Sequence, residues 1–181
     1  AYDVNDDAMK DLIVSRHNDD RTFDCESVVY INGSKGFSTD RAFWFPTKGA
    51  LGNTVGDLDN DGQPEIVFNN TESGHITGFN HYIYLGNKDA KYGVEGRIDI
   101  PTVRGGAKAA VADLDMDGYP EVLFAEFENG NNHIRIHKGT PEGPSLEQFV
   151  DIPTNELLYD VHVADFNRDG YLDILAVIWV F

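Results

Sequence analysis

The chain carries one acidic loop motif four times, and this repetition constrains its fold more than any other feature. Positions 1, 3 and 5 of the motif are Asp or Asn, position 6 is Gly in three copies, and position 9 is Asp or Glu. The copies begin at Asp3, Asp57, Asp113 and Asp165. Alternate acidic residues place oxygen atoms on one side of a tight turn, and Gly at position 6 permits the positive φ that redirects the chain. Such an oxygen cage suits Ca²⁺.

The motif predicts metal ligands by position. Positions 1, 3, 5 and 9 would bind through side-chain oxygens, and position 7 through its backbone carbonyl. The predicted ligands are Asp3, Asn5, Asp7, Met9 and Asp11 in the first loop; Asp57, Asp59, Asp61, Gln63 and Glu65 in the second; Asp113, Asp115, Asp117, Tyr119 and Glu121 in the third; and Asp165, Asn167, Asp169, Tyr171 and Asp173 in the fourth. Ala8 replaces Gly in the first loop, and a left-handed Ala costs about 1–2 kcal/mol. The sequence therefore predicts three Ca²⁺ sites and leaves the first loop open as a fourth.

These loops differ from the EF-hand, which begins with the same acidic residues. An EF-hand needs a bidentate Glu at position 12 and a helix on each side. Position 12 is here Val14, Phe68, Phe124 or Ala176, none of which can bind a metal. Each position-9 acid is instead followed at once by a short apolar run, which is typical of a buried strand. Each loop is therefore expected to join two strands.

The spacing of the loops predicts the architecture. Their first residues lie 54, 56 and 52 positions apart, and Pro-Thr pairs at Pro46, Pro101 and Pro153 keep the same step. Each period contains four short segments with strand character, and a repeat of about 50 residues indicates a propeller or an array. We therefore expect an all-β fold of four-stranded antiparallel β-propeller blades. The prediction is a single partial propeller domain over 1–181 with about three and a half blades, whose repeats are 3–56, 57–112, 113–164 and the incomplete 165–181.

The motif resembles the FG-GAP or VCBS repeat. This is the calcium-binding blade of integrin alpha-chain propellers, several lectins and many secreted bacterial proteins. Residues 163–176 carry the resemblance most fully and residues 111–124 almost as well, and the likeness extends over essentially the whole chain. It implies one Ca²⁺ per loop, on the face opposite the usual partner site. It also implies a seven-bladed propeller, completed by further chain segments or by a second copy of the chain.

The acidic composition follows largely from these loops. The chain of 181 residues has a formal net charge of −17, and fourteen of its acidic side chains occupy predicted ligand positions. The remaining acidity argues against binding to nucleic acids or to anionic membranes. No run of 18 apolar residues occurs, so we expect no membrane span. Loops with calcium dissociation constants of roughly 10⁻⁴–10⁻³ M fill outside cells, which indicates an extracellular, cell-surface or periplasmic location.

The polar connections between the second and third strand of each repeat are the expected place for ligand binding, because binding residues concentrate on loops held by a rigid scaffold. The candidate ligand-binding residues are Arg16, His17, His75, His81 and Tyr82. The sequence favours a calcium-stabilised, non-catalytic extracellular module for adhesion or binding that recognises carbohydrate or protein. The alternative is a propeller domain of a secreted carbohydrate-active enzyme, a polysaccharide lyase or hydrolase, in which His75, His81, Tyr82 or Arg16 supplies the base or stabilises charge. A purely structural segment is the third interpretation.

The remaining aromatic residues are assigned by pattern alone. Trp44 and Trp179 are expected in the core. His133 and His137 lie four residues apart on one strand, so they share a face, which is expected to be exposed. His162 is expected to pack near the propeller axis.

Overall fold

The computed structural model describes residues 1–71, 79–87, 92–127, 130–154 and 156–179. The strands are β1 (Leu12–Val14), β2 (Asp24–Tyr30), β3 (Ala42–Lys48), β4 (Ala50–Gly56), β5 (Glu65–Asn70), β6 (Asn80–Tyr84), β7 (Ile98–Pro101), β8 (Gly106–Ala112), β9 (Glu121–Glu126), β10 (His133–His137), β11 (Phe149–Pro153), β12 (Leu157–Ala164) and β13 (Asp173–Trp179). A 3₁₀ turn, η1, spans Thr39–Arg41, and the described residues contain no α-helix. The all-β prediction is confirmed. None of this described chain forms a helix long and apolar enough to cross a bilayer.

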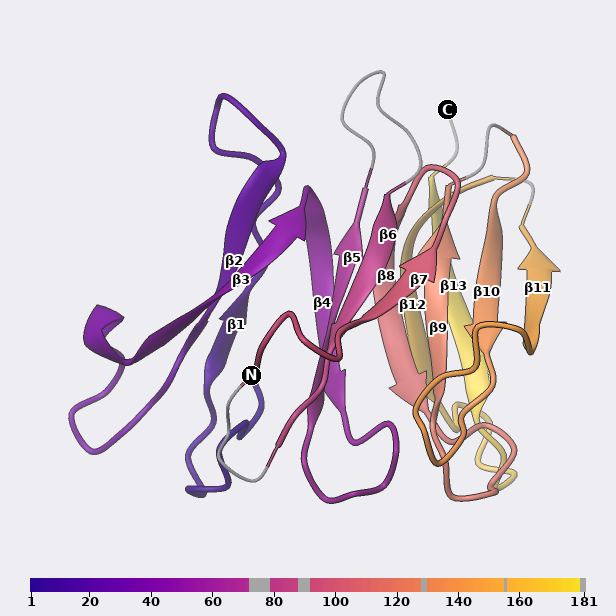
Figure 1. The fold of residues 1–181 in the computed structure, drawn as a ribbon. Helices are drawn as coiled ribbons and strands as arrows, with labels where there is room; N and C mark the ends of the chain where they lie inside the picture. The colour runs from indigo at the N-terminus through magenta and orange to yellow at the C-terminus, as the bar shows by residue number, and fades with distance from the viewer. Residues whose placement is uncertain (72–78, 88–91, 128–129, 155, 180–181) are drawn as a thin grey trace.

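The strands form four antiparallel sheets that stand side by side (Figure 1). The sheets are β1-β2-β3, β4-β5-β6-β7, β8-β9-β10-β11 and β12-β13, so neighbouring strands in each sheet are also neighbours in the sequence. In the first sheet a bridge between Tyr2 and Asp11 lies where the other sheets have a full first strand. This succession of short meandering sheets has the form of β-propeller blades.

The apolar runs that follow the acidic loops become the central strands. Every residue of β5 and of β9 is buried. Successive side chains of a strand point to opposite faces. Accordingly, Ile66 and Phe68 enter one core cluster while Val67 enters the next. A strand covered on both faces must be apolar on both faces, which explains the unbroken hydrophobic runs.

Each core cluster of the described residues lies between two adjacent sheets. Val29 and Phe45 of the first sheet meet Phe68 of the second, and Ile83 of the second meets Val122 of the third. The third and fourth sheets meet through a smaller cluster of aliphatic side chains: Leu123, Ala125, Ile134, Leu158 and Val161. The sheets are therefore held face to face by apolar packing, with no core inside any one sheet.

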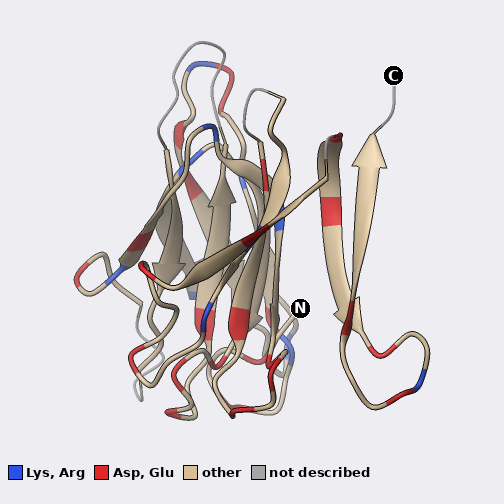
Figure 2. Ribbon diagram, turned by 90° about the vertical axis from the view of Figure 1, so that its right-hand side faces the viewer, with Lys and Arg blue, Asp and Glu red and all other residues tan. Residues whose placement is uncertain are grey.

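The two ends of the sheets carry different kinds of connection. The loops that join β4 to β5, β8 to β9 and β12 to β13 lie together at the lower end in Figure 1, and the loop before β1 lies at the same end. Figure 2 shows acidic residues gathered on these loops. The β1–β2 connection lies at the opposite end, as do the last residues of β5 and β9 and the first residues of β6 and β10. Residues 72–78 and 128–129, between these strands, lie outside the described residues.

Several predictions about single aromatic residues are wrong. Trp44 and Trp179 are each 49% exposed, because they lie on sheet surfaces that no other sheet covers. His133 and His137 are buried, with their Nδ1 atoms 2.9 and 2.8 Å from the carbonyl oxygens of Asn131 and Ser145. His162 is exposed and lies beside Asp160, so it is not a packing residue.

Candidate metal centres in the acidic loops

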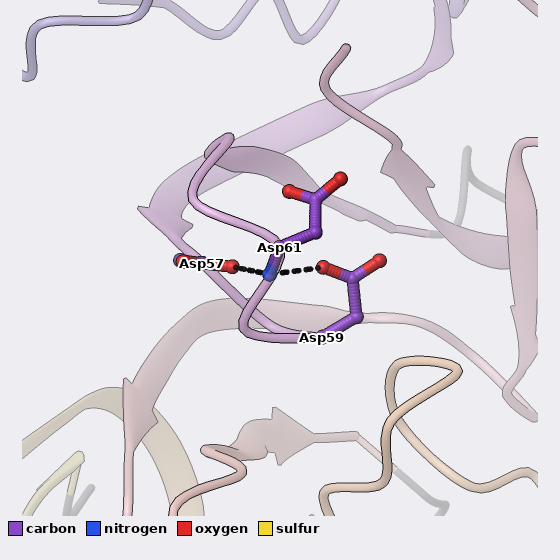
Figure 3. Close-up of side chains that lie close together, drawn as sticks. All are labelled: Asp57, Asp59 and Asp61. Carbon is purple, nitrogen blue, oxygen red and sulfur yellow. Dashed lines mark hydrogen bonds between the residues drawn. The ribbon is translucent and has the colours of Figure 1, made fainter. Parts of the chain in front are cut away.

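The second acidic loop shows how the sequence builds the cage (Figure 3). The backbone N–H of Asp61 donates to Asp57 Oδ1 and to Asp59 Oδ1, both at 3.1 Å. The N–H of Gly62 donates to the other oxygen of Asp57 at 2.9 Å. These bonds fix the side chains of positions 1 and 3, and the three carboxylates each offer an oxygen within 4.8 Å of the others. This arrangement suits a single cation.

The other three loops repeat this hydrogen-bond pattern. In each, the carboxylate at position 1 accepts from the N–H groups of positions 5 and 6, at distances from 2.7 to 3.2 Å. The oxygen at position 3 accepts from position 5, and the oxygen at position 5 accepts from position 7. Asn5 and Asn167, at position 3, also donate their amide to the carboxylate at position 5. All four loops thus share one backbone and side-chain geometry.

The acid at position 9 ties the loop to the sheet. Glu65 is 1% exposed; its Oε2 accepts from Leu58 N at 2.7 Å, and its Oε1 accepts from Gly86 N at 3.1 Å. Glu121 and Asp11 make the equivalent pair of bonds, and Asp173 accepts from Phe166 N at 3.0 Å. A carboxylate has about four acceptor positions, so these bonds leave room for a metal as well. The sequence predicted only the metal-binding role.

Two left-handed residues shape each loop. Position 6 has φ between 87° and 95° at Gly62, Gly118 and Gly170, and φ of 65° at Ala8. Position 4 is also left-handed in every copy, with φ between 58° and 64°: Asp6, Asn60, Met116 and Arg168. Asn and Asp tolerate this conformation, but Met and Arg do so at a cost. The residue type at position 4 differs from copy to copy, whereas the left-handed conformation is the same in all four. The sequence therefore did not indicate this conformation.

The carboxylates of the second loop have unfavourable surroundings for negative charge. Burial raises the pKa of Glu65 to about 7, against the lowering effect of the Leu58 and Gly86 N–H groups. Burial also raises the pKa of Asp59, and the charges of Asp61 and Asp57 add to the effect. In the first loop burial likewise raises the pKa of Asp11. A cation between these oxygens would favour their ionised forms.

A lysine side chain from outside the third loop contacts its carboxylates. The Nζ atom of Lys138 lies against Asp115 Oδ2, donates to Asp117 Oδ2 at 2.6 Å and lies 3.7 Å from Glu121 Oε1. This hydrogen bond lowers the pKa of Asp117, in contrast to the raised pKa of Asp59 in the second loop. Asp113, Asp115 and Glu121 form the second group of acidic residues whose oxygens come within 4.8 Å of one another. The ammonium therefore contacts three of the four carboxylates predicted as metal ligands in this loop.

The structure brings the predicted acidic ligands together within each loop. The two groups that could hold a metal contain ligands from the second and third loops. The first and fourth loops have the same hydrogen bonds, with an Asn replacing one acid. The backbone carbonyls expected to bind at position 7, those of Met9, Gln63, Tyr119 and Tyr171, remain predictions.

The predicted ligand-binding residues that the structure describes have different surroundings. Arg16 is exposed, and His17 packs edge-on against Phe23 with ring centroids 4.9 Å apart. Tyr82 is 6% exposed, with the Arg97 guanidinium 3.6 Å above its ring. His75 lies outside the described residues.

His81 is wrongly assigned as a ligand contact. It is fully buried between the second and third sheets, where its ring stacks on Phe124 with centroids 4.3 Å apart. Its Nε2 lies 3.1 Å from Glu126 Oε1, and the other oxygen of Glu126 accepts from Thr102. The residue therefore joins two sheets. No sequence pattern connects His81 with Glu126, which lies 45 positions away.

Comparison with known proteins agrees with this geometry. A family model described as an FG-GAP-like repeat matches residues 3–68 and 113–176. Each matched range begins at a position-1 aspartate and spans two acidic loops, and together the ranges cover more than half of the chain. No curated protein matched the chain in a sequence search. On the strength of the two matched ranges, the chain belongs to the family of FG-GAP-like repeats.

Proposed function

We propose that this chain is a calcium-stabilised extracellular binding module that recognises carbohydrate or protein and is not itself catalytic. The observation that carries the proposal is the acidic loop, repeated four times with one hydrogen-bond pattern. A catalytic ion would be expected once, in a site with open positions. A cage repeated in every sheet is better suited to a structural ion.

The donor chemistry fits Ca²⁺. Each loop would supply carboxylate or amide oxygens from positions 1, 3, 5 and 9, with a backbone carbonyl from position 7, and hard oxygen donors of this number are what Ca²⁺ takes. The second loop offers Asp57, Asp59, Asp61 and Glu65, and the third offers Asp113, Asp115, Asp117 and Glu121. The Lys138 ammonium in the third cage supports the assignment to a cation.

A bound ion would act as a staple between two strands. Glu65 already connects the loop at Leu58 to Gly86, which follows β6. A cation held by Glu65 and by the aspartates of the loop would therefore join the β4–β5 turn to a third strand of the same sheet. Such sites would bind at roughly 10⁻⁴–10⁻³ M and would be filled outside a cell, which favours an extracellular location.

A polar surface cavity offers a place for a ligand. It has a volume of about 430 Å³ and lies between the first and second sheets, lined by Asp24, Cys25, Glu26, Pro46, Thr47, Lys48, Tyr82 and Arg97. Lys48 pairs with Asp24, and Arg97 forms two bonds to Asp99 at 2.6 and 2.9 Å. The charged and polar groups that line it suit the hydroxyls of a sugar or a polar protein surface.

The enzyme interpretation has less support. Of the residues that would first be tested as catalytic, His81 is buried against Glu126 and the Tyr82 ring is covered by Arg97. Neither is free to approach a substrate in this arrangement.

A glycan array read in Ca²⁺ and in chelator tests the proposal, together with an absorbance assay for the unsaturated products of a lyase. We expect binding without turnover, and weaker binding by Lys48→Ala than by the control Lys35→Ala, which lies outside the cavity. Turnover that depends on Tyr82 or Arg97 would overturn the non-catalytic assignment.

A further inference from the structure

Lys138 has a fixed position beside the third loop. It follows β10 directly, and its backbone is held on both sides: its N–H donates to Gln148 O at 3.0 Å, and its carbonyl accepts from Ser145 N at 2.8 Å. The next residue, Gly139, donates its N–H to Glu121 Oε1 at 3.2 Å. The side chain of Lys138 therefore starts from a backbone that is itself bonded to the loop.

The ammonium contacts three of the four carboxylates that would bind a metal ion. It lies against Asp115 and Asp117 and is 3.7 Å from Glu121. These are positions 3, 5 and 9 of the motif. A Ca²⁺ ion bound by the same oxygens would occupy the same space, so the two cations exclude each other.

The first and second loops lack this lysine. The residue directly before the N–H group that binds the position-9 carboxylate is Ile31 in the first sheet and Leu85 in the second, against Lys138 in the third. The second and third loops have the same four acidic ligands. Lys138 is therefore the difference in charge between two otherwise equivalent sites.

We propose that Lys138 is a tethered cation that competes with Ca²⁺ for the third loop. The inference rests on the proposed calcium binding of the acidic loops. Calcium must displace the ammonium and then bind beside a positive charge, so the third loop fills at a higher Ca²⁺ concentration than the second. Without calcium, the ammonium offsets the repulsion between the carboxylates and keeps the third loop ordered.

The displaced side chain has space to move. Lys138 lines a surface cavity of about 490 Å³ that also contains Glu147 and Gln148. The ammonium can turn away from the loop within this cavity and still face an acidic side chain. Ca²⁺ can therefore displace the ammonium without a steric clash. Lys138 weakens Ca²⁺ binding at the third loop but does not block it permanently.

Backbone amide signals in a Ca²⁺ titration followed by NMR test the inference loop by loop. The N–H groups of Gly62, Gly118 and Gly170 each donate to the position-1 carboxylate of their own loop, so each reports on one site. We expect the midpoint at Gly118 to lie at least about tenfold above that at Gly62. Lys138→Met should lower the Gly118 midpoint by about the same factor. Lys35→Met, a charge-matched control in the turn between β2 and β3, should leave it unchanged.

The reciprocal variant Leu85→Lys places a lysine at the matching position of the second loop. It should raise the Gly62 midpoint and leave Gly118 unaffected. Equal midpoints at Gly62 and Gly118 in the wild type, with no response to Lys138→Met, would overturn the competition while leaving calcium binding intact. No shift at any of the three glycines would overturn the proposed calcium binding, and the competition with it.

Thermal unfolding gives a second measurement. In chelator, Lys138→Met should melt at a lower temperature than Lys35→Met. The carboxylates of the third loop then lose the positive charge that Lys138 supplies. In saturating Ca²⁺ this deficit should disappear, because the metal then supplies the charge. A deficit of equal size in both conditions would mean that Lys138 contributes only packing, and would contradict the proposal.

Discussion

At position 6 of the acidic loops, three glycines and one alanine hold the same left-handed backbone. Ala8 has φ of 65°, and a left-handed Ala costs about 1–2 kcal/mol. We expect Ala8→Gly to stabilise the protein by about 0.5–1 kcal/mol, since the greater freedom of glycine in the unfolded chain removes part of the gain. Urea unfolding in chelator measures the effect. Ala112→Gly in β8 is the control and should destabilise, and a loss of stability in Ala8→Gly would contradict the account.

The charge of Asp59 can be removed with little change of shape. Asn at this position keeps the Oδ1 atom that accepts from Asp61 N and loses one carboxylate from the second cage. Asp59→Asn should therefore weaken Ca²⁺ binding at Gly62 about tenfold or more. In chelator its stability should be unchanged or slightly higher, because burial and neighbouring charges already raise the pKa of Asp59. Asp20→Asn, in the β1–β2 connection, is the control. Equal calcium affinity in both variants would exclude Asp59 from the site.

At the scale of single residues, the sequence predicts the features that depend on local chemistry. The ligand positions follow from residue type and spacing within nine residues. The strain at Met116 and Arg168 was not predicted, because nothing in a Met or Arg side chain indicates positive φ. Lys138 was also missed, because it reaches the third loop only through the pairing of β9 with β10.

The central strands are the elements that the sequence specifies best. Phe124 in β9 is fully buried, stacks on His81 and contacts His137 edge-on. Phe124→Ala should destabilise the protein by roughly 3–5 kcal/mol, because the lost ring leaves a cavity between two sheets. Phe37→Ala removes a ring that is 52% exposed and should change stability by about 0.5 kcal/mol or less. Similar losses in both variants, measured by urea unfolding, would contradict the packing described.

His137 makes the third sheet sensitive to pH. It is 2% exposed, and burial lowers its pKa below the ordinary value of 6.5. The unfolded chain therefore binds a proton that the folded protein resists, so stability is lost as the pH falls through 6.5. His137→Asn keeps a donor for the Ser145 carbonyl and should show a smaller loss of stability between about pH 7 and pH 5.5. Parallel stability curves for the variant and the wild type would exclude His137 as the source.

The strand boundaries and the buried histidines show where sequence patterns end. The boundaries of β4 depend on pairing, because its first residue, Ala50, pairs with Asn70 at the end of β5. His133 and His137 share a face of β10 that is buried, and the Nδ1 atom of each lies beside a backbone carbonyl oxygen, that of Asn131 or Ser145. Periodicity identifies a shared face, but it does not say what covers that face.

At the scale of the whole molecule, the sheets are bound to one another by apolar packing and to their own loops by acidic residues. The core clusters between sheets contain aromatic and aliphatic side chains, whereas the position-9 acids Asp11, Glu65 and Glu121 connect segments within a single sheet. The repeat period predicted the succession of antiparallel sheets, but it did not predict these hydrogen bonds of the position-9 acids. The number of blades in a closed propeller and the partner that completes it remain predictions, because neighbouring blades have similar contacts in rings of different size.

Thermal unfolding of the wild type across a series of Ca²⁺ concentrations is the most direct test of the central claim that the loops are calcium staples. A single site contributes about 1.4–2.7 kcal/mol at 10 to 100 times its dissociation constant. The account predicts that Tm rises by several degrees between chelator and 10 mM Ca²⁺ and continues to rise with the logarithm of the concentration. An equal concentration of Mg²⁺ should produce a smaller rise, because Mg²⁺ gives up its water reluctantly. An identical Tm in chelator and in Ca²⁺ would contradict the account.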